Sequence, residues 1–274
     1  MRSVEIVESW PVPHASVAVV SSAGEVLGSS GDLDRVYRLA SVTKLITSYA
    51  ALVAVEEGVL GLDDPAGPEG STVRHLLAHT AGYDFSERTV RAAPGERRIY
   101  SNVGFEVLGE TIEACSGIPF EDYVRDAVLV PLGMTATSCA GSPAAGASSS
   151  ANDLVRFARE LQAPTILHTS TVTDATSVAF PGLVGVVPGF GRQTPNDWGL
   201  GFEIRDAKSP HWTGATSSPR TFGHFGQSGT FLWVDPDARL ACIALTDRDF
   251  GPWAAQVWPQ LTDAVLAEAA ALGG

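Results

Sequence analysis

Residues 39–55 form the most apolar segment of helical length, and their one charged side chain is Lys44. A helix this apolar is predicted to lie in the core, so the fold must enclose a lysine. Ser41 precedes Lys44 by three residues, so the two side chains share one face of such a helix. Burial favours a neutral amine, and a neutral amine beside a serine hydroxyl is a base beside a nucleophile.

The alternative is that Lys44 runs its stem along apolar surface and keeps its ammonium group in water. The chain has two lysines, Lys44 and Lys208, against sixteen arginines. Arginine does not lose its proton in a protein, whereas lysine does. A chain that uses arginine for nearly every cation, but places lysine in its most apolar helix, favours a chemical role for that lysine.

The composition describes an ordered globular protein of one large or two modest domains, with 274 residues, 45% hydrophobic and 18% charged. The net charge of −13 comes without any basic run, which argues against nucleic acid or an anionic membrane as partner. Glu56 and Glu57 close the longest apolar run before it reaches membrane-spanning length.

Two further features bear on location. The first ten residues lack the apolar centre of a signal peptide. Three widely spaced cysteines, Cys115, Cys139 and Cys242, favour reduced thiols. We therefore expect a cytoplasmic protein.

The pattern of elements predicts strands, then a helical middle, then strands and a last helix. Residues 15–40 read as an antiparallel meander that delivers the chain to Ser41 at a helix N-terminus. Helices are expected at 72–79, 102–115, 120–130 and 153–161, the last capped by Asn152, and at 253–271. Strands are expected at 198–205, 221–225, 230–234 and 239–246, whereas residues 165–197 fit no clear element.

This outline predicts an α/β fold, in the sense of an α+β sandwich, with an antiparallel sheet flanked by helices. Residues 1–65 and 165–274 would form a discontinuous α/β domain, with residues 66–164 inserted as an all-helical lobe.

Two further motifs follow the Ser41–Lys44 pair in order. Tyr100-Ser101-Asn102 opens a predicted helix, and the sequence GHFGQSGT from Gly223 occupies a predicted strand. Together with S-x-x-K at Ser41, they resemble the penicillin-recognising serine hydrolases, specifically the branch of class C β-lactamases, DD-carboxypeptidases and related esterases. The resemblance covers about residues 15–270 and implies a β-lactamase/transpeptidase-like fold that needs no cofactor.

The resemblance also implies roles. Ser41 would attack a carbonyl carbon and form an acyl-enzyme, with either Lys44 or Tyr100 as the formal base. Asn102 would present its amide to Lys44 and to the polar arm of the substrate.

The third motif would form the substrate edge of the sheet. The backbone N–H groups of Ser41 and Gln227 would form the oxyanion hole. Gly226 would let the strand approach the substrate without an intervening side chain.

Two residues depart from the family pattern at the substrate-binding strand. His224 stands where β-lactamases usually carry lysine, and it would be charged only part of the time near neutral pH. Phe225 replaces a small hydroxyl residue and would add an apolar wall. Both changes favour neutral ester or amide substrates over anionic β-lactams, so we expect a small-molecule esterase.

Other functions stay open at this stage. The same site would serve a true β-lactamase, a D-peptide carboxypeptidase, a slow-turnover β-lactam or peptidoglycan-fragment sensor, or an acyltransferase. His75 and His79 have zinc-like i, i+4 spacing, but they lack the adjacent glutamate and a third ligand, so we expect no metal. No G-x-S-x-G elbow is present for a Ser-His-Asp triad. The oligomeric state is left open.

Overall fold

An antiparallel sheet of six strands, in the order β2-β1-β10-β9-β8-β7, is the centre of the computed structural model, which describes residues 1–273. It pairs the first strands of the chain with the last, because Ala15–Ser21 runs beside Leu240–Thr246. Its strands are β1 (Ala15–Ser21), β2 (Val26–Ser30), β7 (Glu203–Ile204), β8 (Phe222–Gly226), β9 (Thr230–Asp235) and β10 (Leu240–Thr246). Two small sheets pair β3 (Val36–Arg38) with β4 (Ser148–Ser150), and β5 (Gly185–Val187) with β6 (Gly191–Gln193).

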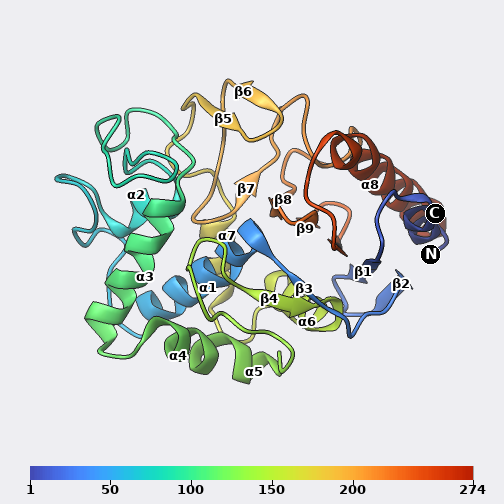
Figure 1. Cartoon of the computed structure of the whole chain (residues 1–274), viewed down its shortest axis with the longest axis horizontal. Coiled ribbons are helices and arrows are strands. Elements are labelled where there is room, and N and C mark those ends of the chain that lie inside the picture. Colours follow the sequence, from blue (N-terminus) through green and yellow to red (C-terminus); the bar gives the residue numbers. More distant parts are fainter. Residues whose placement is uncertain (274) are drawn as a thin grey trace.

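Helices cover both faces of the sheet and form a group at one end of it (Figure 1). The longer helices are α1 (Thr43–Glu56), α3 (Asn102–Ser116), α6 (Ala151–Gln162) and α8 (Pro252–Gly273). The shorter ones are η1 (Ser3–Ser9), η2 (Ala40–Val42), α2 (Val73–Leu77), α4 (Phe120–Val124), the π-helical η3 (Arg125–Leu129), α5 (Val130–Leu132) and α7 (Thr169–Ala175). None of the helices within residues 1–273 has both the length and the apolar composition required to cross a membrane.

Alternating side chains of the sheet enter two separate cores. On β9, Leu232 and Val234 join the larger cluster with α1 and α6, whereas Phe231 and Trp233 join a second cluster beneath α8. Successive side chains of a strand point to opposite faces, so one strand serves both cores. This arrangement confirms the predicted antiparallel sheet flanked by helices.

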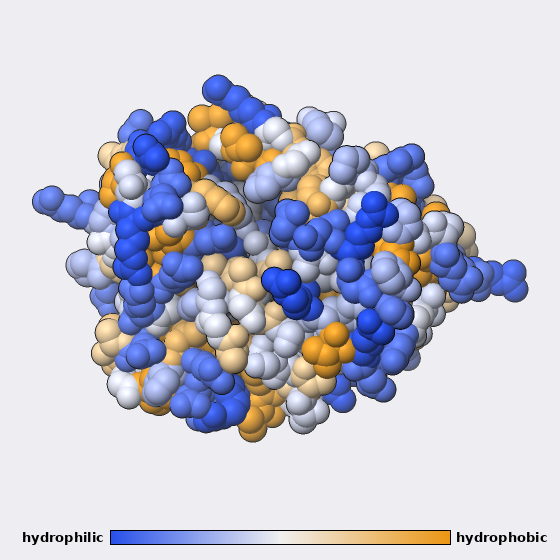
Figure 2. All heavy atoms as spheres, viewed as in Figure 1, coloured by the Kyte–Doolittle hydropathy of each residue, from blue (hydrophilic) through white to orange (hydrophobic). Residues whose placement is uncertain are grey.

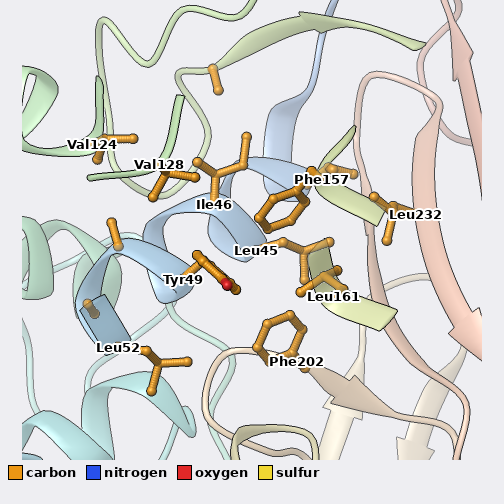
Figure 3. Close-up of a cluster of buried hydrophobic side chains, with 14 of the residues drawn as sticks. Leu45, Ile46, Tyr49, Leu52, Val124, Val128, Phe157, Leu161, Phe202 and Leu232 are labelled. Atoms are coloured by element: carbon orange, nitrogen blue, oxygen red, sulfur yellow. The ribbon is translucent and has the colours of Figure 1, made fainter. Parts of the chain in front are cut away.

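Helix α1 runs through the larger cluster, and its side chains from Thr43 to Ala54 are all buried. Figure 3 shows Leu45, Ile46 and Tyr49 of this helix surrounded by side chains from the helical end, from α6 and from the sheet. Each fully buried aliphatic side chain contributes roughly 1.5–3 kcal/mol through burial. The position of α1 is therefore fixed on all sides, and Lys44 is fixed with it.

Several expected elements differ from the observed ones. β3 leaves the predicted meander and pairs with β4, because the loop at residues 31–35 turns it away from β2. Strand pairing in the predicted strand 198–205 is continuous only at Glu203–Ile204. Ser150, not Asn152, caps α6 by accepting a hydrogen bond from the Asp153 N–H group.

The predicted division into two domains remains a prediction. The packing of α6 is relevant to where the boundary between them lies. The predicted lobe 66–164 includes α6, yet α6 packs against β1, β9 and β10 of the sheet. α1, which the prediction gave to the other domain, contacts α3 and α4. The larger core is accordingly continuous from the sheet into the helical end.

Candidate active site

Ser41 lies in the short 3-10 helix η2, immediately before α1. The preceding residue, Ala40, has a φ of 44°, in the left-handed region that residues with a side chain rarely adopt. This turn takes the chain sharply from β3 into the helix. The Ser41 N–H group therefore lies in the first turn of a helical segment, where backbone donors have no intrahelical partner and developing negative charge is stabilised.

Lys44 is fully buried, and its amine meets three oxygen atoms. Nζ lies 2.7 Å from Asn102 Oδ1, 2.9 Å from the Ala144 carbonyl oxygen and 3.3 Å from Ser41 Oγ. Burial lowers the pKa of Lys44 well below its ordinary value, and the carboxylate of Glu106 offsets only part of that change. A neutral amine has two N–H donors, which Asn102 and Ala144 accept, and its lone pair is left for the hydroxyl proton of Ser41.

Tyr100 lies on the other side of this amine, with Lys44 Nζ 4.7 Å from the centre of the ring. The residue as a whole is partly exposed, but its hydroxyl oxygen is enclosed. Burial raises the pKa of Tyr100, and the neighbouring Ser41 hydroxyl offsets part of that increase. A neutral phenol at this position is a proton donor.

His79 is a site residue whose role sequence reasoning missed. It follows the end of α2 at Leu77 and has a φ of 57°, so it does not share a helix face with His75. Its Nδ1 accepts a hydrogen bond from the Ser101 N–H group at 3.1 Å, and its ring lies 4.6 Å from the ring of Tyr100.

His75 and His79 therefore lack the shared helix face that their zinc-like spacing suggests. His75 Nδ1 instead accepts a hydrogen bond from the Thr72 N–H group at the start of α2. Within residues 1–273, no cluster of three or more histidine, cysteine or acidic side chains has metal-binding geometry. The His79 ring packs against the Tyr100 ring.

His224 is buried on β8, with its ring 5.5 Å from that of Tyr100 and 5.3 Å from that of Trp198. Its Nδ1–H donates to the Phe225 carbonyl oxygen at 2.6 Å. Burial lowers the pKa of His224 to about 3. The expectation of partial charge near neutral pH is thus corrected: His224 is neutral there.

Phe225 and Gly226 do not take their expected places. The Phe225 side chain points to the face of β8 opposite His224 and packs on Phe250 and Trp258 beneath α8, so it forms no wall beside Ser41. A Cβ atom on Gly226 would lie 2.2 Å from the Leu39 carbonyl oxygen. The missing side chain of Gly226 therefore makes room for the segment before Ser41, rather than for a substrate.

The β8–β9 hairpin holds this segment in place. Thr230 Oγ1 donates to the Leu39 carbonyl oxygen at 2.9 Å, and Ser228 Oγ donates to the Arg38 carbonyl oxygen at 2.6 Å. Gln227 lies in the same hairpin, and its N–H group has no acceptor within the described residues. The hairpin thus sets the position of the Gln227 N–H donor relative to Ser41.

The neutral His224 predicts an acid-sensitive fold. Its pKa is about 3 in the folded state and about 6.5 when unfolded, so the unfolded chain binds the extra proton between these values. Stability is therefore lost as pH falls from 6.5 towards 3, by at most about 5 kcal/mol from this residue. His224→Gln, whose amide can still donate to Phe225, should lose less stability on acidification. Urea unfolding at pH 7 and pH 4.5 measures this, and equal losses in both proteins would contradict it.

Known protein families offer an independent comparison. The sequence profile of the beta-lactamase family matches residues 7–267. The chain belongs to the beta-lactamase family. Its members are serine hydrolases, so the resemblance drawn from the three motifs is confirmed.

Two solved structures have a fold similar to that of this chain. A beta-lactamase from Mycobacterium bovis is 56% identical, with a TM-score of 0.96 over 97% of this chain and 99% of that one. EstCE1, described as a hydrolase with promiscuous acyltransferase activity, has a TM-score of 0.79 at 21% identity, over 96% of each chain, and shows the fold alone.

Curated relatives match over shorter regions. Penicillin-binding protein 4* of Bacillus subtilis is 29% identical over 37% of this chain and 30% of its own length. The D-alanyl-D-alanine-carboxypeptidase/endopeptidase AmpH of Escherichia coli is 28% identical over 40% of this chain and 38% of its own length. The match thus spans about a third of each of these relatives.

Proposed function

We propose that this chain hydrolyses small-molecule esters through an acyl-enzyme on Ser41. The observation that carries the proposal is the geometry of Lys44, which is buried, has both N–H donors accepted by oxygen atoms, and lies 3.3 Å from Ser41 Oγ. In the free enzyme, Lys44 is therefore the base and Tyr100 the acid.

The reaction has two halves. Lys44 takes the Ser41 proton as Oγ bonds to the carbonyl carbon, and the N–H groups of Ser41 and Gln227 stabilise the oxyanion. The intermediate collapses, the bond to the leaving oxygen breaks, and that oxygen takes a proton from Tyr100, which Lys44 then restores. Water repeats the sequence on the acyl-enzyme and releases the acid and the free Ser41 hydroxyl.

The preference for esters now rests on His224 alone. β-Lactams carry a carboxylate close to the bond that is cleaved, and a neutral imidazole offers it no charge. The position of Phe225 beneath α8 removes the second reason that the sequence suggested.

β-Lactam hydrolysis is the second candidate, because the 56% identical Mycobacterium bovis protein is described as a beta-lactamase. Peptide cleavage is a weaker candidate than β-lactam hydrolysis, since AmpH matches this chain only over part of its length. Slow acylation by β-lactams without turnover, and acyl transfer to a small acceptor, use the same first half-reaction.

A fluorophosphonate probe and two substrates test the proposal. Mass spectrometry should locate the adduct on Ser41, with Ser41→Ala unlabelled at equal melting temperature. Short p-nitrophenyl esters should exceed a chromogenic cephalosporin in kcat/KM, and a burst without turnover would indicate a sensor. Labelling at another residue would overturn the nucleophile, whereas faster cephalosporin hydrolysis would overturn only the substrate preference.

A further inference from the structure

A pocket of about 440 Å³ adjoins the candidate active site, because Tyr100 is one of the residues that line it. The pocket lies between residues 97–100 and the β5–β6 hairpin. Figure 2 shows apolar and strongly polar residues side by side over that hairpin, at the edge of a hollow. A group bound here would touch the residue proposed to move the proton.

Most of the wall is apolar and open to solvent. Val186 is 57% exposed and Phe85 is 49% exposed, although both are large hydrophobic side chains. Ile99, Val184 and Pro188 continue this surface. Grouped apolar side chains left in contact with water, next to polar groups, are typical of ligand sites.

The charged residues of the pocket are all basic. Arg97, Arg98 and Arg192 line it and no carboxylate does, in a chain whose acidic residues outnumber basic ones by 31 to 18. Arg98 is buried and donates to three backbone carbonyl groups, so it is structural. Arg97 and Arg192 are exposed, and neither forms an ion pair within residues 1–273, although Arg97 Nη2 donates to the Arg91 carbonyl oxygen at 2.9 Å. The Arg192 guanidinium and the remaining N–H groups of Arg97 are thus available to a bound anion.

The two walls are fixed to each other. The Arg98 N–H group donates to the Val184 carbonyl oxygen at 3.1 Å. A Cβ atom on Gly185 would lie 2.7 Å from the Arg98 carbonyl oxygen, so the strand approaches this closely only because glycine stands there. A pocket held open by such contacts loses little conformational freedom when a ligand binds.

We propose that this pocket binds an apolar arm of the substrate that ends in a carboxylate, with the chain on Phe85 and Val186 and the carboxylate between Arg97 and Arg192. The inference rests on the proposed ester hydrolysis and names its substrate class. The neutral His224 disfavours a charge beside the scissile bond, whereas these arginines favour one at the far end of the arm. The arm is part of either the acyl group or the leaving group.

Two matched substrate pairs distinguish these sources. On the acyl side, the mono-p-nitrophenyl ester of adipic acid is compared with p-nitrophenyl hexanoate. On the leaving-group side, the butyrate ester of 3-(4-hydroxyphenyl)propionic acid is compared with that of the corresponding amide. For one pair, the anionic member should have at least about tenfold higher kcat/KM.

The double variant Arg97→Gln/Arg192→Gln should reduce this anionic-to-neutral ratio about tenfold. Arg2→Gln, which removes one positive charge from an exposed position near the N-terminus, should not change it. Added salt should also reduce the ratio in the wild type, because partly exposed charges are screened. Absence of a preference in both pairs, or a preference that survives in the double variant, would overturn the pocket assignment. If no ester is hydrolysed and Ser41 is not labelled, the proposed function fails instead.

Discussion

Replacing Lys44 by arginine is expected to lower kcat for ester hydrolysis by about 10³-fold or more, because the guanidinium group cannot accept the Ser41 proton. Burial lowers the pKa of Lys44 well below its ordinary value, which favours the neutral amine with its free lone pair. The loss should appear in kcat and in the rate of fluorophosphonate labelling, since both need a deprotonated Ser41. Stopped-flow experiments measure the rate of fluorophosphonate labelling directly.

Lys208→Arg is the matched control, because Lys208 is the other lysine of the chain and its side chain is also buried. Its amine donates to the Asp197 carbonyl oxygen at 2.6 Å and does not contact Ser41. Both variants add the same bulk to a closed site, so their melting temperatures separate a packing cost from a chemical one. If Lys44→Arg kept the kcat of Lys208→Arg, the role of Lys44 as a base would be excluded.

Gly226→Ala is expected to lower kcat by about 10²–10³-fold, because the new Cβ atom would lie 2.2 Å from the Leu39 carbonyl oxygen. Either β8 or the segment before Ser41 must move. The separation of the Ser41 and Gln227 N–H groups then changes, and so does the oxyanion hole. The same overpacking should cost about 1–3 kcal/mol of stability.

Gly104→Ala in α3 is the control for this substitution, because the nearest atom to its Cβ position is 3.7 Å away. Alanine favours a helix over glycine, so this variant should be at least as stable as the wild type. Steady-state kinetics and thermal unfolding of both variants check the prediction. Normal kcat in Gly226→Ala would show that β8 accommodates the methyl group without moving the hairpin.

The Ser41–Lys44 pair could be predicted from the sequence because its geometry is local. A spacing of three residues on one helical segment brings the two side chains together, whatever the rest of the chain does. One acceptor of the amine, the Ala144 carbonyl oxygen, lies 100 residues further on in a loop, and no local pattern marks it.

The roles of the residues in the Gly223–Thr230 motif are harder to predict. The alternation of side chains along a strand defines two faces, but it does not show what covers either face. His224 and Phe225 are neighbours on β8, and only the position of α8 shows that the phenylalanine belongs to the second core. The sequence predicts that Gly226 faces the substrate, whereas in the structure it lies against the Leu39 carbonyl oxygen. The spacing of His79 from His75 suggests a shared helix face, but its left-handed backbone, which takes it out of α2, has no visible signal in the sequence.

The pairing of β1 with β10 has a consequence for when activity first appears during synthesis. Ser41 leaves the ribosome early, but the hairpin that supplies Gln227 and holds Leu39 is made about 190 residues later. Contacts between such distant segments form last in folding, since closing a long loop costs entropy before any contact compensates for it. A nascent chain therefore carries Ser41 for most of translation without the Gln227 N–H group that we propose for the oxyanion hole. The protein becomes a catalyst only when its last strands close the sheet.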